Sequence, residues 1–298
     1  MKRKVIAGLF SCVLLVLIVS CENASTNPDL LTEETKASNP YDDIGRMHNE
    51  GLSYVLNYIS VGLPKKHTHA KADGTDQIAG LYDSMFDGIR RFTETRNMQC
   101  PELFKNNRFM HKINDQSKNS SYNGKMFKAV VHTYDCSNEE SEYLSQLETD
   151  IMNTPSRRDL KRLIKERDKE IVRIFEKHKA KHILSGTSIM VHSTKYWEEN
   201  IDAWIAAVTE YVNSNSTGSS ASDNKNLLKL SATSEWDWLK KIAVADVAGG
   251  VGGGLVGAAT GAVATLGAGT VPGWVAGAVV GSLGASSIEC VTQILNSI

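Results

Sequence analysis

Histidines are the first residues whose spacing could support chemistry. His178 and His182 stand four positions apart, which places both rings on one face of a helix, as in helical metal-binding pairs. They fall in the last turn of the helix that we predict around them, where the helix dipole favours positive charge. No cysteine or carboxylate-rich motif with metal-ligand spacing accompanies them. We therefore predict no metal site and no cofactor.

Motifs for nucleophilic catalysis and phosphate binding are missing from the sequence. It contains no G-x-S-x-G, no P-loop and no H-E-x-x-H. Its glycine repeats are no dinucleotide fingerprint, because no strand precedes them and their spacing is a uniform four residues. The 33 basic and 34 acidic residues leave a net charge of −1, which gives no electrostatic footprint for nucleic acid. We predict a non-enzymatic protein without catalytic residues and without a nucleic-acid partner.

Cys21 is the cysteine with the clearest chemical role. A basic start (residues 2–4) and an apolar run (residues 5–19) lead to the sequence IVSC at residues 18–21. This order is typical of a signal peptide, and the run is short for a spanning helix. The residues before Cys21 match the lipobox at which bacterial lipoproteins are cut and acylated. An uncleaved anchor, or a secreted protein cut elsewhere, is the alternative.

We predict a signal peptide at residues 1–20 and acyl chains such as palmitate on Cys21. These chains would hold the protein to a lipid bilayer of the bacterial cell envelope, in the outer membrane or at the cell surface. Residues 21–38 are rich in Asn, Ser, Thr and acidic side chains, with almost nothing to bury. Such a composition does not offset the entropy of ordering, so we expect a flexible tether.

Three other cysteines remain in the mature chain. In an oxidising compartment Cys100 and Cys136 could form a disulfide, although sequence does not determine the pairing. Cys290 lies in an apolar context, which favours a packing role.

Residues 39–213 are expected to form an irregular α-helical domain. Asn39-Pro40 is a helix start signal, and apolar residues then recur at helical spacing as far as Ile59. Further helices are predicted from residue 73 or 75, at 139–152, at 156–184 and at 188–212. The helix at 156–184 is expected to end at Gly186 and to expose a charged, solvated face. Residues 126–134 suit either a strand or a helix. The fold class is therefore all-α.

A Ser/Asn-rich linker at residues 214–226 separates this domain from a glycine-rich segment at 227–298. From Val247 to Ile288 there are 42 residues without a charge. Two glycine ladders step through them by four residues: Gly249, Gly253, Gly257 and Gly261, then Gly269, Gly273, Gly277 and Gly281. Glycine is costly in a solvated helix, whereas a glycine stripe lets two apolar helices approach closely.

These ladders predict a two-helix hairpin that turns near Pro272. Each half has about 20 residues, which at about 1.5 Å each matches a hydrocarbon core of roughly 30 Å. Trp236, Trp238 and Trp274 stand where interfacial aromatic residues belong. One interpretation is a hairpin that inserts in the membrane and self-associates through the ladders. The other is a close-packed pair of helices buried against the N-terminal bundle.

The segment DVAGGVGGGLVGAATGAVATLGAG (residues 246–269) resembles the glycine zippers of small envelope lipoproteins and of double-glycine class II bacteriocins. That resemblance implies a segment that enters, or packs within, membranes. The order of a lipobox, NPYDDIGRMHNEGL (residues 39–52), SIMVHSTKYW (residues 188–197) and a terminal zipper is similar to uncharacterised secreted proteins of Bacteroidota, which implies no activity.

Three functional hypotheses follow from these features. The first is a non-enzymatic envelope lipoprotein whose hairpin inserts in or packs at the membrane. The second is a bacteriocin-like effector that permeabilises membranes. The third is an envelope module that binds a ligand around His48, Trp197 and Trp204.

Overall fold

The computed structural model is built from helices, some of which begin at signals that the sequence shows. The structure describes residues 39–61, 74–98, 136–215, 232–261 and 271–297. Within these ranges the regular structure is seven helices and no strands, so the fold is all-α. Several predicted features lie outside the described residues: the predicted signal peptide and tether, Cys21, Cys100, Gly269 and most of the predicted linker.

The first two helices follow their predicted apolar stripes. Asn39 caps the start of α2 (Asp42–Val61), because its side-chain oxygen accepts a hydrogen bond from the Tyr41 amide at 3.0 Å. Helix α3 (Gly74–Thr95) packs beside α2. Its apolar face is buried as expected from the spacing, with Leu81, Tyr82, Met85, Ile89 and Phe92 all in the core.

Helix α7 (Asn138–Met152) begins with a capping box in which Ser137 and Glu140 satisfy each other's backbone amides. The prediction of a single helix at residues 156–184 is wrong. The chain instead forms α8 (Arg157–Ile174) and α9 (Lys177–Asn215), separated by Phe175 in an extended conformation. Phe175 leaves the helical path because its ring is buried against Tyr143 of α7, with ring centroids 5.2 Å apart.

Gly186 does not end a helix, contrary to the prediction. It lies inside α9, which continues to Asn215, two residues into the predicted linker. A Cβ atom at position 186 would lie 3.1 Å from the Val247 carbonyl oxygen of α10 (Ala232–Gly261). This glycine therefore allows α9 and α10 to pack closely.

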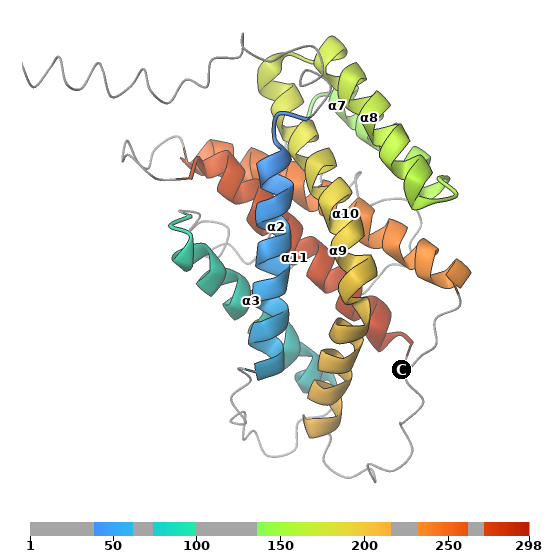
Figure 1. Cartoon of the computed structure of the whole chain (residues 1–298). Helices are drawn as coiled ribbons and strands as arrows, with labels where there is room; N and C mark the ends of the chain where they lie inside the picture. The colour runs from blue at the N-terminus through green and yellow to red at the C-terminus, as the bar shows by residue number, and fades with distance from the viewer. Residues whose placement is uncertain (1–38, 62–73, 99–135, 216–231, 262–270, 298) are drawn as a thin grey trace, which may run out of the picture. The chain divides into compact units, whose positions relative to one another are not determined.

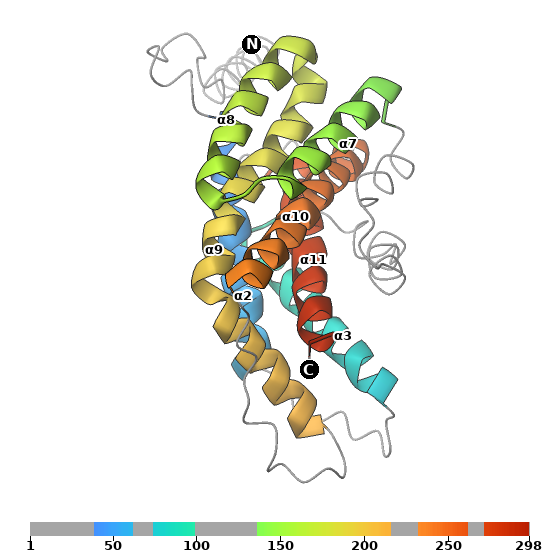
Figure 2. The same cartoon turned by 90° about the vertical axis from the view of Figure 1, so that its right-hand side faces the viewer.

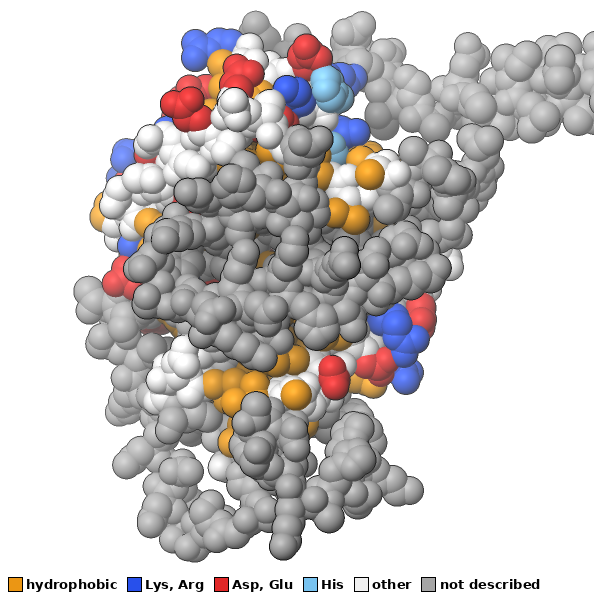
Figure 3. All heavy atoms as spheres, turned by 180° about the vertical axis from the view of Figure 1, so that it is seen from behind, with side chains coloured by type: hydrophobic (Ala, Val, Ile, Leu, Met, Phe, Trp, Pro, Cys, Tyr) orange, Lys and Arg blue, Asp and Glu red, His pale blue; other side chains and the backbone are white. Residues whose placement is uncertain are grey.

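Helices α10 and α11 (Gly273–Leu295) form the expected hairpin, and other helices pack around it. In Figures 1 and 2, α2 and α9 run side by side across the hairpin, and α3 packs on α11. On the face drawn in Figure 3, charged side chains gather along the upper edge and at the lower right, and hydrophobic side chains show in small patches. Residues Asn39–Ile298 form one unit, so the hairpin is part of the bundle rather than an appendage.

Candidate functional site

The contact between α10 and α11 is made by backbone against backbone. Gly249, Gly253 and Gly257 of α10 face Gly281, Gly277 and Gly273 of α11. A Cβ atom at each of the three α10 positions would lie 2.4, 2.1 and 2.1 Å from the facing glycine carbonyl oxygen. Side chains cannot occupy that space, so only glycine permits this approach of the two helices. Gly261 is the last residue of α10.

A second glycine stripe on α10 faces the surrounding helix α9. A Cβ atom at Gly250 would lie 3.0 Å from the Ile189 side chain, and one at Gly254 would lie 3.0 Å from His182 Nδ1. Together with Gly186, these glycines let α9 lie directly on the hairpin. In the described part of the chain, both glycine surfaces of α10 are thus occupied within the same molecule.

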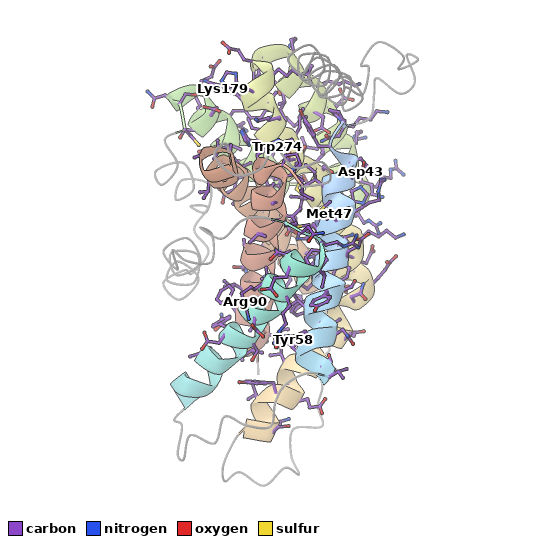
Figure 4. The ribbon with its side chains drawn as sticks, turned by 90° about the vertical axis from the view of Figure 1, so that its left-hand side faces the viewer. Asp43, Met47, Tyr58, Arg90, Lys179 and Trp274 are labelled. Carbon is purple, nitrogen blue, oxygen red and sulfur yellow. The ribbon has the colours of Figure 1, made fainter. Side chains whose placement is uncertain are left out.

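Trp274 is held at the start of α11 by residues of two other segments. Its ring makes edge contacts with Tyr41 and His182, at centroid distances of 5.3 and 6.1 Å. Lys181 Nζ lies 5.2 Å from the same ring. Figure 4 shows Trp274 where the start of α11 meets α2 and α9. We call this arrangement the tip clamp, because it holds the first turn of α11.

Burial determines the charge state of the histidine in this clamp. Desolvation, reinforced by the positive charge of Lys181 and by His178, lowers the pKa of His182 to about 4. Its Nδ1 atom has no hydrogen-bond partner among the described residues. His182 is therefore neutral near pH 7, which suits its edge contact with the indole.

A buried polar pair joins α2 to the hairpin. His48 Nε2 lies 3.1 Å from Asp246 Oδ1, and both side chains are 0% exposed. The Ser286 hydroxyl of α11 lies 3.4 Å from the same nitrogen, and Asn49 Oδ1 lies 3.3 Å from Nδ1. Both ring nitrogens thus lie near oxygen atoms of neighbouring side chains, while neither carboxylate oxygen of Asp246 makes a hydrogen bond among the described residues. Removing either side chain of the pair would leave the other polar group buried without this neighbour.

Sequence reasoning placed His48 on the first helix but did not pair it with Asp246. One signal was present, because Asp246 is the last charged residue before the uncharged run of 42 residues. A carboxylate at that position must be exposed, or it must meet a partner from another helix. The sequence does not tell which helix supplies the partner.

The base of the hairpin is tied to α7 by polar contacts. Trp236 Nε1 donates to the Thr154 carbonyl at 2.9 Å, and Lys240 Nζ donates to the Met152 carbonyl at 2.8 Å. Trp238 is buried in the core. In this structure Trp236 and Trp238 therefore make contacts inside the helical bundle.

The remaining predicted site residues are dispersed. His178 is exposed beside Glu176, whereas His182 faces the tip clamp, so the two histidines do not share a site. Cys136 is half-buried at the edge of a hydrophobic cluster, and the Cys100–Cys136 pairing stays a prediction. Cys290 is buried. Among the described residues, no group of three or more His, Cys, Asp or Glu is placed to hold a metal ion.

The residues suggested for ligand binding belong to the core. Trp197 and Trp204 are almost completely buried, with ring centroids 5.1 Å apart. A hollow lies between α2, α8 and α9, and most of its polar lining residues pair with each other or with neighbouring residues. There the Asn49 amide donates to the His192 carbonyl, the His192 ring contacts Asp42, and Lys195 pairs with Glu199.

Helices α10 and α11 have the length and composition of membrane spans. The qualifying segments are Glu235–Ala259 and Gly273–Leu295, and their most apolar windows are 78% and 89% buried inside the bundle. Comparison with protein-family models, with curated proteins and with solved structures gives no match. The candidate functional site is therefore the glycine-packed hairpin together with the residues that hold it.

Proposed function

We propose that this protein is a lipid-anchored protein of the bacterial envelope that stores an apolar hairpin in a helical bundle and transfers it into a bilayer. The lipobox at Cys21 supports the anchor. The observation that carries the proposal is the direct glycine contact between two helices of spanning length.

This contact is independent of the surrounding helices. Gly253 and Gly277 meet backbone to backbone, so their contact needs no side chain from α2, α3 or α9. Close packing of small residues is also what associates helices inside lipid, where the hydrophobic effect between helices is absent. The hairpin can accordingly keep the same internal interface in the bundle and in a bilayer.

The surrounding helices cover the apolar surface that the hairpin would otherwise expose to water. Amphipathic helices such as α2 and α3 turn apolar residues inward and charged ones outward. The tip clamp and the His48–Asp246 pair hold the hairpin in place. Transfer requires that these contacts open while the hairpin stays paired.

Two engineered disulfides test the proposal. The double variant Gly186→Cys, Val247→Cys would tie α9 to α10, because a Cβ at position 186 lies 3.1 Å from Val247 Cγ1. The matched control Gly254→Cys, Ala278→Cys ties α10 to α11, because the two Cβ atoms would lie 3.6 Å apart. Both double variants are made in the full secreted chain that also carries Cys21→Ala, so that no acyl chain contributes to membrane retention.

Membranes are then extracted with alkaline carbonate before and after reduction. We expect carbonate to release the oxidised α9–α10 variant from the membranes, whereas its reduced form should stay in the membrane fraction. The oxidised α10–α11 variant should be retained as well, since that disulfide preserves the hairpin. Complete release of every form would contradict the proposal and would make the hairpin an internal packing element.

A further inference from the structure

Helix α8 presents a row of basic side chains to the outside of the bundle. These side chains are all exposed and recur every three or four residues along one side of the helix: Arg158, Lys161, Arg162, Lys165, Lys169 and Arg173. The other side packs inward through Leu160, Ile164 and Ile171. Figures 1 and 2 show α8 at the periphery, against α9. We call these six residues the basic face.

Most of the positive charge on the basic face is unmatched. Arg162 pairs with Asp159 at 2.8 Å and Lys169 with Glu166 at 3.5 Å. For the other four residues of the face, the described part of the chain provides no ion pair. The chain as a whole carries a net charge of −1, so this surface is a local concentration of positive charge.

An exposed apolar side chain continues the basic face at its C-terminal end. Val172 lies among these basic residues and is 62% exposed, which is unusual for a large hydrophobic residue of this bundle. A helix that combines basic residues with exposed aliphatic ones is typical of surfaces that lie on anionic membranes.

The predicted tether joins the bundle beside the basic face. Asn39, the first described residue after it, donates its side-chain amide to Asp168 of α8 at 3.1 Å. The same amide donates to the Leu184 carbonyl at 2.7 Å and contacts Thr187 Oγ1 at 3.2 Å. Asp168 belongs to α8, so the point where the chain enters the bundle is fixed next to these basic residues.

From this arrangement we infer that the basic face of α8 is a contact surface for the anionic lipids of a bilayer. The inference rests on the proposed function, which brings a bilayer within reach of residue 39. Acyl chains and a basic surface are complementary signals, because one holds the protein near the membrane and the other orients it. The partner of the basic face is a lipid surface rich in phosphatidylglycerol-type head groups.

Sedimentation with vesicles tests this inference on the full secreted chain carrying Cys21→Ala. One vesicle preparation is phosphatidylcholine alone, and the other is an equal mixture of phosphatidylcholine and phosphatidylglycerol. We expect binding to the mixed vesicles only, and we expect it to weaken as salt rises. Replacing Arg158, Lys161, Lys165 and Arg173 by Gln should reduce the affinity by about 1,000-fold, at about 1 kcal/mol for each residue.

A matched variant controls for total charge. Arg46, Arg90, Arg91 and Arg96 are exposed on α2 and α3, and replacing these four by Gln removes the same charge elsewhere. This control should bind like the parent. Equal loss in both variants, or no preference of the parent for anionic vesicles, would overturn the inference. So would tighter binding to duplex DNA than to mixed vesicles at equal phosphate concentration.

The oxidised α9–α10 disulfide variant separates this inference from the proposed function. Its hairpin is tied to the bundle, so any salt-sensitive binding to mixed vesicles must come from the surface. Salt-sensitive binding that persists while no form of the protein resists carbonate extraction would support lipid contact by the basic face and contradict transfer of the hairpin. Carbonate resistance that appears on reduction, without a preference for anionic vesicles, would support transfer of the hairpin and contradict lipid contact by the basic face.

Discussion

His48 Nε2 lies 3.1 Å from Asp246 Oδ1, and neither side chain is exposed to solvent. The two residues belong to α2 and α10, so this contact connects the first described helix to the hairpin.

The first prediction concerns this pair. His48→Ala removes the imidazole beside the buried Asp246 side chain, and we expect the free energy of unfolding to fall by about 1–3 kcal/mol. Urea denaturation measures the loss. Replacing both residues by Leu should recover much of it, because an apolar pair leaves no buried polar group without a partner. A double variant as unstable as His48→Ala would show that shape, rather than polarity, explains the effect.

The second prediction compares neighbouring glycines on α10. Gly253→Ala would place a methyl group 2.1 Å from the Gly277 carbonyl oxygen, so the two helices must separate. We expect this variant to lose about 1–3 kcal/mol of stability. Gly254→Ala meets the His182 side chain at 3.0 Å, which can shift, and gains helix propensity. Thermal unfolding should rank the two variants clearly, and equal stabilities would contradict the backbone contact.

The third prediction uses the pH dependence of Asp168. Burial raises the pKa of Asp168 to about 6 from its ordinary 3.8, despite hydrogen bonds from Thr187 and Asn39. Its contribution to stability is therefore fully present below pH 3.8 and is lost as the pH rises through 6. Relative to Asp168→Asn, the parent protein should lose up to about 3 kcal/mol between pH 4 and pH 7. Parallel stability curves for the two proteins would refute this.

The fourth prediction concerns His182 in the tip clamp. Its pKa is lowered by burial to about 4, below the ordinary 6.5. The unfolded chain thus binds the proton more readily, so stability is present above pH 6.5 and is lost as the pH falls through 4. His182→Gln should flatten this loss. Trp274 fluorescence, isolated by comparison with Trp274→Phe, should report the opening of the clamp in the same pH range.

Several elements could be predicted from the sequence because their signals are local. The capping pair Ser137 and Glu140 marks α7, and the apolar stripe from Leu81 to Phe92 marks the buried side of α3. The uncharged run beginning at Val247 and its regular glycines likewise indicate two apolar helices in a hairpin. Spacing along one chain segment contains all of that information.

Contacts between distant segments were decided only by the tertiary structure. Gly186 resembles a helix stop, yet α9 continues through it because α10 passes too close for a side chain. Phe175 divides a helix that its neighbours would continue, because its ring is buried on Tyr143. Asp168 belongs to a charged run but turns inward to Asn39 and Thr187.

The sequence by itself determined the all-α class, the hairpin and its glycine spacing, because helix periodicity and backbone propensity act within a few residues. The tertiary structure decided that the hairpin is enclosed by amphipathic helices and that His48 meets Asp246. Those outcomes depend on how helices from distant parts of the chain pack together. A buried charge or an apolar surface specifies that a partner is needed, and only packing selects which residue supplies it.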